Sequence, residues 1–518
     1  MTPRDVELPE GRLRGQVQAG VARWLGVSYA QAPLHALRLR APRPPQPWRG
    51  LRDALLPGPA CLQVLAGPQT WLNPPLAATA EDCLTLNIWA PAEPSAAPAP
   101  VLLWFHGGAT RSGHGASPAS DGSRLARQHG LVVVTVNYRL GALGGLAHPL
   151  LEDDLSGQCA NWGLQDKLAA LAWVHRSIAA FGGDPSRITI GGQSSGAANV
   201  ALIVQHGLDG GRAARAIVQS PPLFRTPMFA TLDEAAEYTE LLAHALDVTV
   251  PGLRTVEGAR LQQAEHALAH SPELLARMAR PRTAPVLDGR LLRAWSHDAP
   301  VATMPVLAGW TATESDFWFK LHDDAGHRLS PLAAPTADAF AARAAKLIAL
   351  HHAFPDRPPA ADWATHYAPP GRDPAQAWQA LYTDLVFRAP TAHWLARHAR
   401  AGTPAWGYAF AQPIASADGG TPHAADVPFV FGTVAHPHLA PKIGELDAAE
   451  RTSDATRAAW SAFVRDGDPG AAAGTPWPRF DDVSPRVMQF GGEAVAQVQP
   501  LDRAEALACW PGYALAGG

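Results

Sequence analysis

The sequence predicts an α/β fold, in which helices flank both faces of a large, mostly parallel central sheet. The segment LVVVTVNY (131–138) is short, β-branched and apolar on both faces, as is typical of a central strand covered on each side. A helical pattern at 163–183 and a second strand, RITIGG (187–192), follow it. Strand, helix and strand in this order form the crossover unit of parallel sheets.

Further strands are expected on both sides of this unit. The apolar segments 83–90 and 100–107 are separated by APAEPSAAPAP (90–100), which we interpret as a loop between strands and not as a domain boundary. Buried strands are also expected at 304–310 and 404–410, where MPVLAGW and PAWGYAF are almost wholly apolar. The sheet is therefore expected to continue far beyond the first crossover.

Two long stretches between these strands are helical in character. Residues 231–280 and 336–400 are rich in Ala, Leu, Glu and Arg, with apolar residues at helical spacing. Helical excursions that interrupt one continuing sheet favour one large domain over three separate domains. We expect a single domain over 1–518, with helical cap insertions at about 229–300 and 330–400.

Composition excludes several classes of partner. The 42 Lys and Arg residues nearly balance 46 Asp and Glu, and no extended basic run could follow a phosphate backbone, so nucleic-acid binding is not expected. No apolar stretch approaches the ~18 residues that cross a bilayer, and the first residues lack the apolar core of a secretory signal. As written, the sequence predicts a cytoplasmic chain without a membrane span, or a secreted one if a signal was removed.

A nucleophile is the clearest chemical prediction. GQSSG (192–196) lies between the strand RITIG and a helix-like segment that begins GAANVALIVQH. Serine is a weak nucleophile unless a tight turn exposes its oxygen, and the glycines on either side allow a strained turn from strand to helix. The alternative is a glycine-rich loop that matches by chance. The strand and helix around it favour Ser194 as the nucleophile.

A second glycine-rich segment, WFHGGATRSGHG (104–115), follows a strand directly. Backbone N–H groups that stabilise a developing oxyanion need a loop with small side chains, and such a segment provides one. An ordinary glycine-rich turn is the alternative. The segment 104–115 lies at a strand end and before the nucleophile in the chain, which favours the interpretation as an oxyanion loop.

These segments and others resemble the type-B carboxylesterase and cholinesterase family of α/β-hydrolases. EDCLTLNIW (81–89) is similar to its S-E-D-C-L-x-L-N signature, and NYRLGALGGL (137–146) to N-Y-R-L-G-x-L-G-F-L. The block at 161–197 parallels the longest family block, and segments within 460–480 resemble the closing helix and tail. The resemblance covers nearly the whole chain. It implies an α/β-hydrolase fold and a serine hydrolase that acts on a small-molecule carboxylic ester.

The resemblance also implies a catalytic triad of Ser194, Glu314 and His423. The acid of the family lies five residues after a glycine that follows a strand, and counting from Gly309 gives Glu314, with Asp316 as its local competitor. The base of the family is a histidine followed by a short acidic and aromatic stretch. The segment HAADVPFVFG, which begins at His423, matches that pattern. The chain order Ser, Glu, His is the order expected of this fold. Such a triad works through an acyl-enzyme and calls for neither cofactor nor metal.

The implied oxyanion donors are the backbone N–H groups of Gly108, Ala109 and Ser195. The chain departs from the family at three nearby positions. Ala109 replaces the third glycine of H-G-G-G, Gln193 replaces the usual glutamate, and Ser195 replaces the usual alanine. The glutamate lies near the cationic alcohol group in the cholinesterase branch, so Gln193 predicts a preference for uncharged esters over choline esters.

Aromatic residues and cysteines complete the expectations. Phe317, Trp318 and Phe319, just beyond Glu314, suit either an apolar pocket wall or ordinary core packing. Cys61 and Cys83 occupy positions that the family commonly bridges, so the resemblance implies a possible disulfide in an oxidising compartment and none in a reducing one.

Three alternative functions remain open at this point. The same mechanism could act on amides, carbamates or thioesters, which sequence does not separate from esters. A catalytically silent binding module of the same fold would usually have lost the serine or the histidine. A metallohydrolase could use His266 and His270, four residues apart, but no glutamate follows His266 and no third ligand is apparent.

Overall fold

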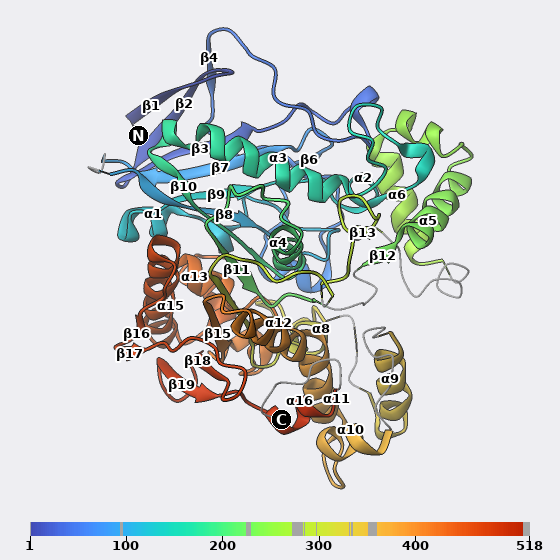
Figure 1. Cartoon of the computed structure of the whole chain (residues 1–518), viewed down its shortest axis with the longest axis vertical. Helices are drawn as coiled ribbons and strands as arrows, with labels where there is room; N and C mark the ends of the chain where they lie inside the picture. Colours follow the sequence, from blue (N-terminus) through green and yellow to red (C-terminus); the bar gives the residue numbers. More distant parts are fainter. Residues whose placement is uncertain are drawn as a thin grey trace.

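The computed structural model describes residues 2–93, 97–223, 229–271, 283, 285–296, 298–330, 332, 335–350 and 360–510. Within them, a 13-stranded sheet runs through the molecule (Figure 1). Its strands, in spatial order, are β1 (Thr2–Leu8), β2 (Gly11–Gln18), β3 (Val21–Ser28), β7 (Thr85–Pro91), β9 (Val132–Val136), β8 (Ala99–Phe105), β10 (Gly183–Gln193), β11 (Arg215–Gln219), β14 (Val306–Thr311), β15 (Ala405–Phe410), β18 (Arg486–Phe490) and β19 (Ala496–Pro500), while β4 (Leu51–Asp53) pairs with β2.

The middle of the sheet is parallel, from β9 through β8, β10, β11, β14 and β15 to β18. The pairs toward the two edges, β1 to β9 on one side and β18 with β19 on the other, are antiparallel. The α/β fold with a mostly parallel central sheet is therefore confirmed. The predicted strands at 83–90 and 100–107 exist as β7 and β8, but β9 lies between them in the sheet.

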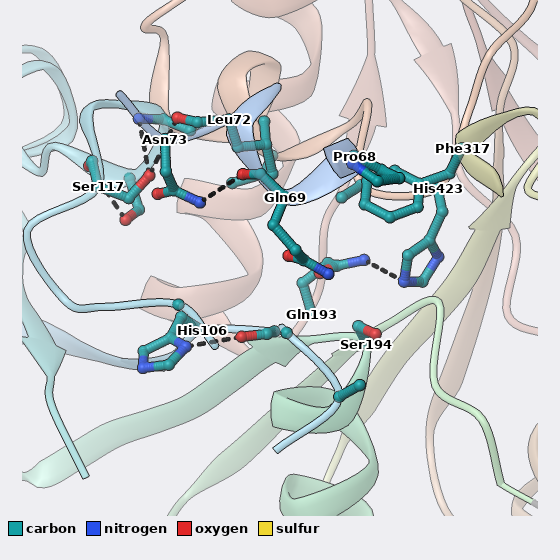
Figure 2. Close-up of a pocket in the computed structure, with 18 of the residues that line it drawn as sticks. Pro68, Gln69, Leu72, Asn73, His106, Ser117, Gln193, Ser194, Phe317 and His423 are labelled. Atoms are coloured by element: carbon teal, nitrogen blue, oxygen red, sulfur yellow. Dashed lines mark hydrogen bonds between the residues drawn. The ribbon is translucent and has the colours of Figure 1, made fainter. Parts of the chain in front are cut away.

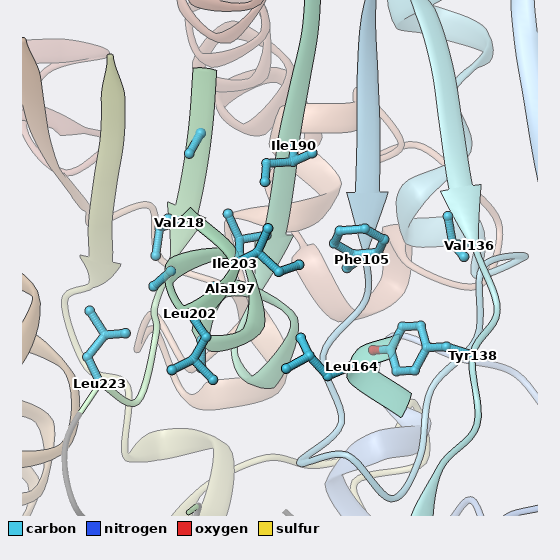
Figure 3. Close-up of a cluster of buried hydrophobic side chains, with 14 of the residues drawn as sticks. Phe105, Val136, Tyr138, Leu164, Ile190, Ala197, Leu202, Ile203, Val218 and Leu223 are labelled. Carbon is cyan, nitrogen blue, oxygen red and sulfur yellow. The ribbon is translucent and has the colours of Figure 1, made fainter. Parts of the chain in front are cut away.

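Helices cover both faces of this sheet. In β9, Val132 and Val134 belong to the buried cluster on one face, and Val133 belongs to the cluster on the other. Figure 3 shows α4 packed against β10 and β11 in the first cluster. The first face carries α3 (Trp162–Ser177), α4 (Ser195–Gln205) and α12 (Ala389–Arg400); the second carries α1 (Ser123–His129), α13 (Val427–Phe431) and α15 (Leu446–Asp466).

A pair of glycines follows the crossover helix. After α3, a 3-10 turn at Ile178–Phe181 leads to Gly182, which has φ 83° and caps the turn in the left-handed region that glycine adopts readily. Strand β10 begins at the next residue, Gly183. The strand then runs directly to the predicted nucleophile.

Helices also occupy the two predicted insertions, α5 and α6 at the upper right of Figure 1 and α9 to α11 at the lower right. Parts of these predictions, at 272–282 and 351–359, lie outside the described residues. The division into one domain with cap insertions stays a prediction. The helices are α5 (Leu232–Ala245), α6 (Gly258–Ala269), α9 (Ala337–Leu350), α10 (Ala360–Tyr367) and α11 (Pro374–Thr383).

Shorter elements connect these layers. The short helices are α2 (Gly141–Gly145), α8 (Asp316–Phe319), α14 (Ala440–Ile443) and α16 (Ala504–Ala508). Three two-stranded pairs are β5 (Ala60–Cys61) with β6 (Thr79–Ala80), β12 (Ala230–Thr231) with β13 (Val286–Leu287), and β16 (Ala471–Ala472) with β17 (Thr475–Pro476). Among the described helices, none is both long and apolar enough to cross a bilayer.

Candidate active site

Ser194 occupies the turn between β10 and α4. Its backbone has φ 56° and ψ −126°, a conformation that residues other than glycine rarely adopt. Such backbone strain is concentrated at functional sites. The turn is held on both sides, because the N–H of Ser194 donates to the carbonyl of Gln219 at 2.8 Å and its carbonyl accepts from the N–H of Ala198 at 2.9 Å. The half-buried Ser194 side chain faces the cavity described below.

The two glycines of the predicted motif are needed for close approach. A Cβ on Gly192 would lie 2.6 Å from the carbonyl carbon of Gly196. A Cβ on Gly196 would lie 2.2 Å from the backbone oxygen of Phe105, at the end of β8. The spacing of the motif therefore reflects how tightly the start of α4 packs against β8 and β10.

Glu314 and His423 form a close buried pair. Nδ1 of His423 lies 2.6 Å from Oε2 of Glu314, and both side chains are almost wholly buried. The backbone N–H of Thr311 donates to the other carboxylate oxygen, Oε1, at 2.8 Å. The last residue of β14 thus holds the Glu314 carboxylate in place, and the carboxylate in turn fixes the orientation of the imidazole.

Asp316, the competing acid, binds other partners. Its carboxylate accepts a hydrogen bond from Gln379 at 2.5 Å and lies 3.4 Å from the ammonium of Lys320. Burial raises the pKa of Asp316 above its ordinary value. The structure thus brings Glu314, and not Asp316, against the imidazole.

The other ring nitrogen of His423 has a partner that the sequence did not suggest. Nε2 of Gln193 lies 3.0 Å from Nε2 of His423, as Figure 2 shows with a dashed line. Gln193 is the last residue of β10 and precedes the serine. Among the described residues, the hydroxyl of Ser194 makes no hydrogen bond.

Aromatic rings surround the imidazole. The ring centroids of Phe317, Trp318 and Phe387 lie 5.7, 5.3 and 4.6 Å from that of His423. Phe319 instead packs against Trp378 and Tyr382. Two of the three predicted aromatic residues therefore line the site. Phe387 comes from a π-helical turn, Asp384–Arg388, and such turns often occur at functional sites.

The glycine-rich loop passes beside the serine. A Cβ on Gly107 would lie 2.9 Å from Cβ of Ser194, so the loop approaches the nucleophile closely. Ala109 and Thr110 both have positive φ, of 54° and 60°. The N–H of Thr110 donates to Oγ of Ser195 at 3.2 Å. This hydrogen bond of the Ser195 side chain connects the loop to the start of α4, a role that the family resemblance does not imply.

A buried layer supports this loop from behind. The hydroxyl of Tyr138 donates to the carbonyl of His106 at 2.6 Å, and the two rings stack with centroids 4.3 Å apart. The ammonium of Lys167 lies 3.3 Å from the centroid of the Tyr138 ring. Burial lowers the pKa of His106 to about 3 and that of Lys167 to about 7. His106 is therefore a neutral structural residue at ordinary pH.

A second buried carboxylate lies near the Glu314–His423 pair. Oδ2 of Asp426 accepts hydrogen bonds from the hydroxyl of Tyr408 at 2.6 Å and from Nε2 of Gln219 at 2.7 Å. Burial raises the pKa of Asp426 to about 6, and the nearby charge of Glu314 adds to the effect.

The serine, the histidine and the glycine-rich loop meet at one cavity of about 100 Å³ (Figure 2). All three implied oxyanion donors belong to this region, since Gly108 and Ala109 line the cavity and Ser195 directly follows Ser194. Polar and aromatic side chains complete its wall. They include Gln69, Asn73, Trp104, His106, His114, Ser117, Ser120, Gln193, Phe317 and Trp318.

The two cysteines are adjacent but unbridged. Cys61 and Cys83 are free, buried thiols in this structure, and their pairing in an oxidising compartment stays a prediction. The N–H of Leu140 donates to Sγ of Cys61 at 3.3 Å. A hydrogen bond with Cys61, together with burial, raises the pKa of the Cys83 thiol. Both thiols are therefore packed in the interior of the protein.

His266 and His270 do not belong to this cavity. They lie at the end of α6 and immediately after it, are exposed, and have ring centroids 4.6 Å apart. Within the described part of the chain, no group of three or more His, Cys, Asp or Glu side chains could hold a metal ion.

Known proteins resemble this chain over nearly its whole length. The family model described as the carboxylesterase family matches residues 2–510. The chain is 34% identical over 511 residues to the fumonisin B1 esterase of Sphingopyxis macrogoltabida, covering 96% of this chain and 88% of that protein. It is 29% identical over 510 residues to the para-nitrobenzyl esterase of Bacillus subtilis (strain 168), covering 96% and 97%.

Solved structures share the overall fold of this chain. A thermophilic PNB esterase superposes with a TM-score of 0.82 at 28% identity, covering 98% of this chain and 99% of that one. A Geobacillus stearothermophilus carboxylesterase at pH 6.8 gives a TM-score of 0.80 at 30% identity, again over 98% and 99%. The likeness extends over the whole fold and not over one motif.

Proposed function

Because this chain belongs to the carboxylesterase family and is an ester hydrolase, we propose that it cleaves esters through a Ser194–His423–Glu314 triad and an acyl-enzyme intermediate. The observation that carries the proposal is the 2.6 Å contact between Nδ1 of His423 and Oε2 of Glu314, beside a serine in a strained strand-to-helix turn. A fixed acid, an oriented imidazole and a serine hydroxyl that faces a cavity are the three parts that serine hydrolysis needs.

The first half of the reaction forms the acyl-enzyme. Nε2 of neutral His423 takes the proton of the Ser194 hydroxyl as Oγ attacks the ester carbonyl carbon. The carbonyl electrons move to oxygen, and the resulting oxyanion accepts hydrogen bonds from the N–H groups of Gly108, Ala109 and Ser195. One such donor typically contributes ~3 kcal/mol to stabilising the transition state. The C–O bond to the alcohol then breaks, and the imidazolium protonates the leaving alcohol.

The second half regenerates the serine. Water loses a proton to Nε2 of His423 and attacks the acyl carbon, and the bond to Oγ of Ser194 breaks as that oxygen takes the proton back. Glu314 stays ionised throughout. It holds the Nδ1–H tautomer and stabilises the imidazolium in both halves.

The substrate side of the proposal is an uncharged ester with a small to medium acyl group. The cavity of about 100 Å³ suits a small group, and the aromatic faces of Phe317 and Trp318 suit an apolar one. Gln193 supplies no carboxylate for a cationic alcohol.

Product partitioning tests the covalent intermediate. Esters that share one acyl group but differ in their alcohol are hydrolysed in water containing a fixed amount of methanol. A common acyl-enzyme gives the same ratio of methyl ester to free acid from every one of them, because water and methanol compete for the same species. A ratio that depends on the leaving alcohol would exclude the common intermediate.

A further inference from the structure

Nε2 of His423, the atom that must accept the serine proton, is already occupied. Nδ1 faces the carboxylate of Glu314, and an ionised carboxylate only accepts hydrogen bonds, so Nδ1 carries the ring proton. Nε2 is then an acceptor, and the amide of Gln193 donates to it at 3.0 Å. The two contacts require the same tautomer of the ring and support each other.

The carboxamide of Gln193 is held where it lies. A Cβ on Gly107 would lie 2.4 Å from Oε1 of Gln193, so the carboxamide packs against the oxyanion loop at a point where only glycine fits. Gln193 is 4% exposed and His423 is 3% exposed. The contact is therefore a buried bridge between the loop and the imidazole, and not a flexible surface contact.

We propose that Gln193 is a positioning residue of the hydrolysis, which holds the resting imidazole through Nε2 and yields that place to Ser194 when an ester enters the cavity. This inference rests on the proposed function, because it concerns the same histidine. One hydrogen bond to Nε2 replaces another as substrate binds. The resting imidazole is thereby kept neutral and correctly turned before substrate arrives.

The charges around His423 make the effect of residue 193 measurable. Glu314 faces Nδ1, and three aromatic rings cover the sides of the imidazole. On the Nε2 side, Gln193 is an uncharged donor. A carboxylate there would accept a hydrogen bond from the protonated Nε2 and stabilise the imidazolium. Two further titratable groups lie near His423: Asp426, on the same loop as the histidine, and Tyr408 on β15, which binds Asp426. His106 and His114, on the glycine-rich loop, line the same cavity.

Two near-isosteric variants separate charge from hydrogen bonding. Gln193→Glu replaces the donor by an anion, and Gln193→Met removes the donor without adding charge. For each, kcat and kcat/KM are measured against pH with a neutral ester; kcat/KM reports ionisations of the free enzyme and kcat those of the substrate complex. Gln69→Met is the matched control, since Gln69 lines the same cavity without a hydrogen bond to His423.

The two Gln193 variants are expected to shift the low-pH limb of the activity profile by different amounts. In Gln193→Glu, the low-pH limb of kcat/KM moves upward by about one pH unit, as an adjacent opposite charge stabilises the imidazolium. In Gln193→Met, the kcat/KM limb moves upward by about half a unit because one hydrogen bond to the neutral ring is lost. The kcat limb of the Met variant stays in place, since substrate has already displaced the amide. Gln69→Met leaves both limbs where they are.

Coincident kcat/KM limbs for wild type and both Gln193 variants would overturn the inference. Crystal structures of the wild-type enzyme, free and with a phosphonate on Ser194, provide a test that needs no variant. The free enzyme should keep the Gln193–His423 contact, and the adduct should lack it. A free enzyme in which Ser194 Oγ binds Nε2 and Gln193 points away contradicts the proposal. If phosphonate labels Ser194 but the limbs do not move, only this inference fails.

Discussion

Nδ1 of His423 and Oε2 of Glu314 are 2.6 Å apart, although the two residues are separated by 109 positions in the chain. The contact depends on the loop after β14 and the loop after β15, two neighbouring parallel strands. Because parallel strands end at the same edge of a sheet, both loops reach the edge where Ser194 follows β10. The fold therefore assembles the site from three strand ends.

This pair predicts that the two nearby acids differ sharply. Glu314→Gln should lower kcat by about 10⁴, because an amide can donate to Nδ1 and favour the wrong tautomer. Asp316→Asn, the matched change two residues on, should retain kcat within about threefold, since Asp316 binds Gln379 and Lys320 instead. Steady-state kinetics on a neutral ester measures both. A large loss in Asp316→Asn with little in Glu314→Gln would reverse the assignment.

The glycine motif predicts a folding cost at one position. Gly196→Ala places a Cβ 2.2 Å from the backbone oxygen of Phe105, so β8 or α4 must shift. We expect a loss of about 3 kcal/mol or more in unfolding free energy, with activity lost as the turn distorts. Gly252→Ala is the control, where the nearest atom is the Thr249 hydroxyl at 3.2 Å. Urea unfolding compares them, and equal stabilities would mean that the turn is looser than described.

Sequence patterns predict those parts of the molecule whose structure depends on short segments of the chain. The central strands, the crossover helix and the turn at Ser194 follow from periodicity and glycine spacing, which short segments contain. The contact of Gln193 with His423 joins residues 230 positions apart. The packing of Phe387 on the same ring depends on a π-helical turn. Such contacts arise from tertiary packing, and no local pattern specifies them.

Two details of the site differ in how far the sequence can predict them. The family resemblance implies only a backbone role for Ser195, but a hydroxyl at the first position of α4 is well placed to accept a hydrogen bond from a backbone N–H, here that of Thr110. Asp426 belongs to the motif that begins at His423. Its burial among Tyr408 and Gln219 depends on β15 and β11, so its environment could not be read from the motif.

Asp426 predicts how stability depends on pH. Its pKa is about 6 in the folded protein, raised by burial, against ~3.9 in an unfolded chain. Between these values the folded state binds more protons, so this group makes stability fall as pH rises through that window. Asp426→Asn removes the effect. The unfolding free energy of the variant relative to wild type should therefore increase by about 1 kcal/mol from pH 5 to pH 7. A difference that is constant or decreases over that range contradicts the assignment.

Gln193 predicts discrimination between neutral and cationic alcohols. Esters of equal acyl length, one with a quaternary ammonium alcohol and one with a neutral isostere, should show a higher kcat/KM for the neutral ester. No carboxylate at position 193 faces the alcohol side. A tenfold advantage for the cation, equal to ~1.4 kcal/mol of transition-state binding, would contradict this preference.

Covalent labelling tests the central claim most directly. A phosphonylating reagent is added to the wild-type enzyme, to Ser194→Ala and to Ser195→Ala, and the modified peptide is identified by mass spectrometry as activity is followed. We predict one phosphonyl group on Ser194 in wild type and in Ser195→Ala, activity lost in proportion to labelling, and neither label nor esterase activity in a folded Ser194→Ala. Labelling of Ser195 with Ser194 unmodified, or wild-type turnover by Ser194→Ala, would contradict the account.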